Sequence, residues 1–319
     1  MARFGNDLSR AIGQSRAAPV LLAVSGGPDS MAMLALAHAA TPGGIAAATV
    51  DHRLRTEAAD EAAMVGRWCA SHGVPHATLV PAFPIGGASL QARAREVRYA
   101  LLAEHAAAIG AACVATAHHV DDQAETFLMR AARGSGLAGL AGVRSRTAIS
   151  GVTVVRPLLE WRRAELRAIV RRLEMPFVDD PANIDLRHDR TRFRRLLDAN
   201  EWLDPPNLAR AAAALAEVDA DIRAAVDWLW DAHAVVDGVT VRIRPEGLPR
   251  ELRRRLVRRA LVAVQRAADI DSPASSQSVN IEPLLDSLDA GRRATQAGVL
   301  ASPRGGEWRF RPAPPRRLH

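Results

Sequence analysis

Lysine is missing altogether from this chain of 319 residues, so all 42 of its lysine-or-arginine side chains are arginine. An enzyme without lysine forms no Schiff base and no lysyl-adenylate intermediate. It also lacks the Walker A phosphate loop, which ends in Lys-Ser or Lys-Thr. The formal net charge of +7 is therefore arginine charge. It fits either an anionic partner, such as a nucleic acid, or a surface of scattered arginines.

Cysteine and long apolar runs are also scarce. Cys69 and Cys113 are the two cysteines, and they form neither a CxxC pair nor the Cys/His spacing of a zinc site. No apolar run approaches the ~18 residues that a membrane helix needs, and the N-terminal segment has no signal-like core. Apolar residues still make up 48% of the chain, enough for the cores of two domains. We expect a reduced, cytoplasmic, globular protein without membrane contact.

The first half of the chain alternates between strand-like and helix-like segments. Apolar runs predict strands at 20–24, 45–51, 77–80 and 113–117. Helical patterns lie between them at 31–40, 57–72 and 89–109. This order is typical of the α/β class with a doubly wound parallel sheet, whose ligand crevice lies at the carboxyl ends of the strands.

The sequence changes character near Asp204. After it come a predicted helix at 207–236, a strand at 239–243, an arginine-dense helix at 248–268 and a hairpin at 297–311. The hairpin prediction rests on the Gly305-Gly306 pair between two apolar stretches. We predict a catalytic domain over 1–203 and a smaller domain, mainly helical or α+β, over 204–319.

The segment from Ser25 to Ser30, Ser-Gly-Gly-Pro-Asp-Ser, joins the first predicted strand directly to a helix. Such a turn points backbone N–H groups and the positive helix end at one spot, which suits a phosphate. The carboxylate of Asp29 would repel a phosphate unless a divalent cation lies between them. The loop therefore predicts a site for a nucleotide polyphosphate bound with a metal ion.

A second chemical segment runs from the end of the fourth predicted strand into a helix. His118-His119 is followed by Asp121, Asp122 and Glu125. Helix capping accounts for one of these carboxylates, whereas Asp122 and Glu125 share a helix face at i, i+3. Facing Asp29, they would form a Mg²⁺ site. His52 also follows a strand end. The arginines around Tyr99 are by themselves typical of a solvated helix face, whereas the dense arginine group over 187–195 predicts phosphate contacts.

Taken together, these segments resemble one known family. The loop at 25–30 is similar to the SGGxDS signature of the N-type ATP pyrophosphatases, or PP-loop proteins, which cut ATP between its α- and β-phosphates. Further segments in the family order lie at 50–55, 94–99, 118–126, 133–140 and 156–159. With them, the chain resembles the tRNA(Ile)-lysidine synthetase family. It departs from the family pattern at Ala182 and Thr191.

The resemblance implies ATP and Mg²⁺ as cofactors, with free L-lysine and the CAU-anticodon isoleucine tRNA as substrates. In the family reaction ATP adenylates O2 of the wobble cytidine, and the lysine ε-amine then displaces AMP from C2. The implied nucleotide-binding residues are Ser25, Gly26, Gly27, Asp29, Ser30 and His52. Metal binding falls to Asp29 and Asp122, and the catalytic set is Asp29, Arg98, His118, Asp122, Glu125 and Arg192.

Arginines of the same segments are candidate tRNA contacts, namely Arg130, Arg133, Arg190 and Arg194, and the second domain is a candidate tRNA-binding domain. The general base stays undecided, with a preference for His118 because an imidazole titrates near neutral pH. A homodimer stays open, as relatives can dimerise.

Three alternatives remain. A sulfur-transferring tRNA enzyme of the same superfamily would use paired cysteines or a metal-bound cluster, against which the isolated Cys69 and Cys113 argue. A synthetase forming NAD or an amide would act on small substrates and would not need the Arg-Gly-Ser-Gly segment at 133–136. A catalytically silent protein that binds nucleotide and RNA would not need all four of the acids Asp29, Asp121, Asp122 and Glu125.

Overall fold

The computed structural model describes residues 2–13, 18–54, 56–87, 90–179, 189–270 and 280–314. The departure at Ala182 lies outside these ranges, as do Arg55 and Ser89 at the edges of two predicted segments. The chain divides into two compact units, Met1–Glu217 and Val218–His319. The division falls inside the long helix α9 (Pro205–His233), which begins one residue after the predicted boundary at Asp204.

The first unit is built on a six-stranded sheet with the order β3-β2-β1-β4-β6-β5. The first four strands along the chain are β1 (Val20–Ala23), β2 (Ile45–Val50), β3 (His76–Leu79) at one edge of the sheet, and β4 (Cys113–Ala115). These four are parallel, as is β6 (Val152–Val155), while the edge strand β5 (Arg146–Ile149) runs antiparallel to β6. The predicted α/β class and its four strands are confirmed. The β5–β6 hairpin was not predicted.

Helices cover both faces of this sheet. The helices of the unit before α9 are α1 (Ala2–Ile12), α2 (Pro28–Ala40), α3 (Ala58–Ser71), α4 (Leu90–Ala108), α5 (Val120–Ala132), α6 (Leu137–Leu140), α7 (Arg163–Arg172) and α8 (Asp189–Asp198). Buried side chains of α1, α2, α3 and α7 form one core with the strand residues of one face. Tyr99 and Leu102 of α4 pack against Leu21, Val114 and Val154 on the other face. Apolar residues on both faces explain why β1 and β4 read as continuous apolar runs.

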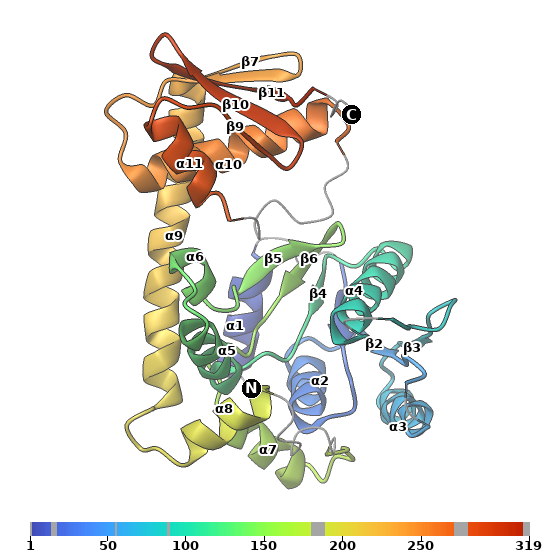
Figure 1. Ribbon diagram of the computed structural model, residues 1–319. Helices are drawn as coiled ribbons and strands as arrows, with labels where there is room; N and C mark the ends of the chain where they lie inside the picture. The colour runs from blue at the N-terminus through green and yellow to red at the C-terminus, as the bar shows by residue number, and fades with distance from the viewer. Residues whose placement is uncertain are drawn as a thin grey trace. The chain divides into compact units, whose positions relative to one another are not determined.

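The strand order places a topological switch point between β1 and β4. From β1 the chain moves through α2 to β2 on one side, and it later returns to add β4 on the other side. In open α/β sheets ligands bind outside the carboxyl ends of strands at such a point. The glycine-rich loop follows β1 and the His118-His119 pair follows β4, so the topology brings these two segments together (Figure 1).

The second unit combines helices with a five-stranded antiparallel sheet of order β7-β8-β11-β10-β9. Its strands are β7 (Ala234–Asp237), β8 (Thr240–Ile243), β9 (Ala294–Gln296), β10 (Val299–Arg304) and β11 (Glu307–Pro312). Helices α10 (Arg250–Ala267) and α11 (Glu282–Asp289) pack on one face. Gly305 and Gly306 form the predicted hairpin turn, with φ values of 58° and 79° that favour glycine. Of the two expectations, mainly helical or α+β, the unit is α+β.

Within the described ranges, no helix is both long and apolar enough to cross a bilayer.

The core of the second unit depends on Phe310, which is fully buried on the helix-facing side of β11. Replacing Phe310 with alanine removes a ring that α10 and the sheet enclose, so we expect a loss of about 3–5 kcal/mol in the free energy of unfolding. Denaturant unfolding followed by circular dichroism would measure it. The control Thr295→Ala changes an exposed residue on the opposite face of the sheet, and its effect should stay within about 0.5 kcal/mol. Equal effects of the two substitutions would contradict the assigned core.

Candidate active site

The glycine-rich loop forms a tight turn between β1 and α2. Gly26 has a φ of +83°, a left-handed conformation that side chains other than glycine rarely adopt. The Ser30 hydroxyl donates to the Gly27 carbonyl at 2.9 Å and accepts from the Ser25 N–H at 3.1 Å. Val178 also donates its N–H to the Gly26 carbonyl at 3.0 Å.

These bonds leave the start of α2 open to a ligand. Gly27 is the N-cap, and no side chain of the described residues caps the helix. An uncapped helix N-terminus after a glycine turn is a binding site for an anion such as phosphate.

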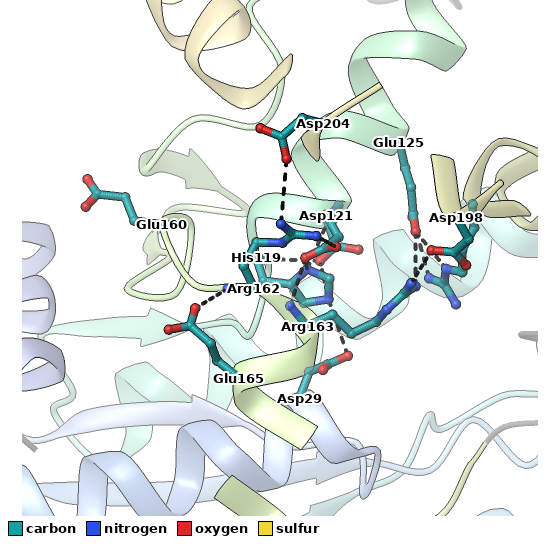
Figure 2. Close-up of polar contacts among 12 residues, drawn as sticks. Asp29, His119, Asp121, Glu125, Glu160, Arg162, Arg163, Glu165, Asp198 and Asp204 are labelled. Carbon is teal, nitrogen blue, oxygen red and sulfur yellow. Dashed lines mark hydrogen bonds and ion pairs between the residues drawn. The ribbon is translucent and has the colours of Figure 1, made fainter. Parts of the chain in front are cut away.

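Asp29, in the first turn of α2, meets His119 at the switch point. The His119 Nε2 lies 3.5 Å from Asp29 Oδ2, and Figure 2 shows the imidazole between Asp29 and Asp121. The other oxygen, Asp29 Oδ1, is buried and has no hydrogen-bond partner in the part of the chain that the structure describes. A buried carboxylate oxygen without a partner is costly. It fits a cation or an ordered water as its missing partner.

His119 also begins helix α5. The ring Nδ1 of His119 accepts the backbone N–H of Asp122 at 3.3 Å. The backbone N–H of His119 in turn donates to Asp122 Oδ2 at 3.0 Å, and the two bonds make a reciprocal capping box. Burial disfavours the charged imidazole, but the nearby carboxylates of Asp122, Asp29 and Asp121 outweigh it and raise the pKa of His119. The family resemblance implied a role for His118, which stays a prediction. The residue that connects the two loops is its neighbour.

Asp121, whose Oδ2 lies 3.6 Å from His119 Nδ1, also serves the fold. Its Oδ2 accepts the Arg163 N–H at 2.8 Å at the start of α7, and its Oδ1 lies 3.4 Å from Arg162 Nη2. A carboxylate at a helix N-terminus satisfies a free N–H and complements the helix dipole. Asp121 therefore joins α5 to α7.

Glu125 is a buried anion surrounded by arginines. Its side chain is 1% exposed, and its two oxygens accept from Arg190 Nε and Arg194 Nε, each at 2.7 Å. Arg163 Nη1 lies 3.7 Å away. Arg190 and Arg194 are four residues apart on α8, so one face of α8 is held against α5.

Arg190 also reaches the second predicted metal ligand. Its Nη2 donates to Asp122 Oδ1 at 2.7 Å. Burial opposes ionisation of Asp122, but the charges of His119 and Arg190 outweigh it and lower the pKa of this carboxyl group. Both Asp122 oxygens are thus engaged, one by Arg190 and the other by the His119 N–H.

A magnesium ion therefore fits Asp29 better than the predicted pair. Among the described residues there is no group of three or more His, Cys, Asp or Glu side chains that could hold a metal ion. Mg²⁺ bound to a nucleotide commonly takes one or two protein carboxylates and completes its shell with phosphates and water. Asp29 can serve as that one carboxylate. Asp122 stays a predicted ligand, and its Oδ1 becomes available if Arg190 moves.

Three further predicted site residues, His118, His52 and Arg98, lie near the carboxyl ends of the strands. His118 is held through Nδ1 at 3.0 Å from Thr116 Oγ1. Burial, together with Arg156, Arg190 and Arg95, lowers the pKa of His118 to about 4, although Asp122 opposes the shift. At the end of β2, His52 Nε2 accepts from Arg98 Nε at 3.5 Å. Burial, and then the Arg98 charge, lowers the pKa of His52. Both imidazoles are therefore neutral at pH 7.

The predicted phosphate-contacting arginines have differing surroundings. Arg130 donates to the carbonyls of Gly139 and Gly142 at 2.7 and 3.2 Å, which holds the 133–142 segment on α5. Arg133 and Arg192 are more than 60% exposed and lie 2.6 and 3.9 Å from Asp189. Arg133 and Arg192 can therefore turn to a phosphate without abandoning a buried acid, unlike Arg190 and Arg194, whose partner is Glu125. The predicted RNA and phosphate roles stay predictions.

The fold and the phosphate loop define a class of protein. The PP-loop domain family matches residues 2–200. Among solved structures, the U34-tRNA thiolase NcsA from Methanococcus maripaludis with its [4Fe-4S] cluster aligns with a TM-score of 0.54 at 17% identity. The alignment covers 68% of this chain and 78% of that one, and it shows a shared fold.

Whole-chain relatives narrow the class. The tRNA(Ile)-lysidine synthase of Novosphingobium aromaticivorans is 42% identical, over 99% of this chain and 98% of its own length. The protein of the same name from Zymomonas mobilis is 41% identical, over 93% of this chain and 89% of its own length. The chain belongs to the tRNA(Ile)-lysidine synthase family of PP-loop proteins. The resemblance that the motifs indicated is confirmed.

Because Arg190, Arg194 and Arg163 surround Glu125, we expect the free energy of unfolding to depend strongly on this carboxylate. In Glu125→Gln an amide replaces the anion, so its NH₂ faces an arginine donor. Arg194 loses its buried counter-charge, while Arg190 and Arg163 lose one of their two acids and keep Asp122 and Asp198. We expect a loss of about 3 kcal/mol in the free energy of unfolding, because breaking a buried ion pair leaves uncompensated charge. Denaturant unfolding would measure it. Glu160→Gln, at a carboxylate that is 71% exposed, is the control, and a loss no larger than that of the control would refute the assignment.

His118 predicts a pH dependence of stability. Its pKa is about 4 in the folded chain against 6.5 for an ordinary histidine, so between these values the unfolded chain binds the extra proton. The free energy of unfolding therefore falls as pH drops from about 6.5 to 4, by on the order of 3 kcal/mol from this residue. Unfolding measured at pH 7 and pH 5 should show a smaller pH effect in His118→Gln than in the wild type. Identical pH effects would contradict burial of a neutral His118.

Proposed function

We propose that this chain ligates L-lysine to C2 of the wobble cytidine in the CAU-anticodon isoleucine tRNA, with ATP converted to AMP and pyrophosphate. The observation that carries the proposal is the uncapped phosphate loop at the switch point of the sheet, next to Asp29 Oδ1, a buried oxygen without a hydrogen-bond partner among the described residues. Membership of a family whose members are named tRNA(Ile)-lysidine synthase supports the choice of substrate.

In the first step the cytidine O2 attacks the α-phosphorus of ATP and pyrophosphate leaves. The loop from Ser25 to Ser30 would hold the departing pyrophosphate by its backbone N–H groups and by the end of α2. Asp29 would hold Mg²⁺, which neutralises phosphate charge when bound. His119 keeps the Asp29 carboxylate in place by its contact at 3.5 Å.

In the second step the lysine ε-nitrogen attacks C2, the C2–O bond to AMP breaks, and the ammonium group gives up a proton. His118 is neutral at pH 7 because its pKa is about 4, so its imidazole can accept that proton, although as a weak base. Arg98 of α4 donates to His52, which follows the end of β2. It would face the negative charge that develops on the α-phosphate.

Sulfur transfer is disfavoured by the two cysteines. Cys69 and Cys113 are buried, and burial raises the pKa of each thiol to about 11. A thiol that stays protonated at neutral pH is a poor nucleophile and a poor cluster ligand.

The test is transfer of labelled lysine to the CAU-anticodon isoleucine tRNA in the presence of ATP and Mg²⁺. We expect label in the tRNA and equimolar release of AMP and pyrophosphate. The Asp29→Asn variant should lower the rate by at least about 100-fold, because a charge that stabilises the phosphoryl transition state is lost, while its affinity for tRNA is unchanged.

Glu104→Gln, at an exposed position on α4, is the matched control and should keep wild-type activity. Absence of label with folded wild-type protein would refute the proposed reaction, and full activity of Asp29→Asn would refute the role of Asp29.

A further inference from the structure

The arginine-dense helix of the second unit is neutralised within the unit. Five arginines of α10 contact carboxylates of α9, α10 or α11: Arg250, Arg253, Arg254, Arg255 and Arg259. Arg255, for example, donates to the fully buried Asp219 at 2.8 Å. Hydrogen bonds from Arg254 and Arg250 lower the pKa of Glu282 to about 2, so this acid stays charged at neutral pH. These five arginines therefore hold helices together and offer little charge to a ligand.

The opposite surface of the sheet carries arginines of a different kind. Along β8 and β11, Val241, Ile243, Trp308 and Phe310 are buried toward α10. The alternate residues Arg242, Arg309 and Arg311 are exposed on the other side, as the period of two in a strand requires. We call Arg242, Arg309 and Arg311 the arginine face of the sheet.

Two of these arginines lie directly opposite each other. Arg309 of β11 pairs in register with Arg242 of β8. Side chains in such positions are about 5 Å apart at Cβ, and like charges there destabilise a sheet. Their neighbours in the same row are the uncharged Val235 of β7 and Ser302 of β10. Glu307, the acid that β11 places nearby, is paired with Arg244 at 3.4 Å.

The register therefore leaves a repulsive pair that an external anion would relieve. Neither Arg242 nor Arg309 forms an ion pair with any residue that the structure describes. Arginine binds phosphate through two parallel N–H donors, and the exposed guanidinium groups of adjacent strands offer several such forks on one surface. A row of phosphates matches this arrangement better than one carboxylate does.

We propose that the arginine face binds the sugar-phosphate backbone of the RNA substrate. The proposal rests on the proposed function for the choice of an RNA partner. Contacts of this kind orient an RNA without reading its sequence, since phosphates are the same at every position. The arginine face, and not the arginine-dense α10, is the phosphate-binding surface of the second unit.

The experiment compares the wild-type chain with the double variant Arg242→Gln/Arg309→Gln in binding to the CAU-anticodon isoleucine tRNA over a range of salt concentrations. We expect the slope of log affinity against log salt to fall by about 0.7–0.9 for each arginine removed, with weaker binding at low salt. The melting temperature of the double variant should equal or exceed that of the wild type, because the substitutions remove a repulsive pair.

A matched control removes the same charge elsewhere in the unit. Arg266→Gln/Arg292→Gln changes two exposed arginines outside β8 and β11 and should leave the salt slope near that of the wild type. The proposal is overturned if the salt slope of Arg242→Gln/Arg309→Gln equals that of the wild type. It is also overturned if the control variant loses as much of the salt slope as Arg242→Gln/Arg309→Gln does. If the wild type binds tRNA with the expected arginine dependence but transfers no lysine, the arginine face stands and the proposed ligation fails.

Discussion

The buried imidazole of His119 is the contact on which the site depends. It lies where the segments that follow β1 and β4 meet, and carboxylates from both segments surround it: Asp29 from α2, and Asp121 and Asp122 from α5. A histidine can do this because one ring nitrogen accepts the N–H that begins α5 while the other faces Asp29. Without it, the carboxylates of Asp29, Asp121 and Asp122 would lose the ring whose nitrogens lie within 3.6 Å of all three.

Arginine supplies nearly all the other counter-charges, as the chain has no lysine. Guanidinium groups stay charged when buried and hold two oxygens at a time, which suits them to acids within a core. Glu125 with Arg190 and Arg194 in the first unit, and Glu282 with Arg250 and Arg254 in the second, repeat this arrangement. The net positive charge of the chain is therefore a poor guide to where a polyanion binds. Arginines that are not held by a buried acid are the better candidates for such binding.

Much of the fold was predictable because it follows from local sequence patterns. The strand at 20–24, the glycine turn after it and the hairpin at Gly305-Gly306 follow from apolar runs and turn residues. The β5–β6 hairpin was missed because its strands are short, with Ser150-Gly151 as a weak turn signal. For the site, the loop and the acidic start of α5 were identified. His118 was implied by the family resemblance. That its neighbour His119 contacts Asp29 could not be predicted, because adjacent residues differ in the direction in which the backbone points them.

The sequence by itself determined the class of the protein: the glycine turn, the alternation of strands and helices, and the order of the motifs need only local information, and the family match bears them out. Tertiary structure decided the partners of each charge. Glu125 reads as a metal ligand in a one-dimensional motif, yet Arg190 and Arg194, more than 60 residues away, occupy its oxygens. Likewise, only strand register reveals that Arg242 and Arg309 face each other. Electrostatic energy depends on distance in space, and the chain order does not contain that distance.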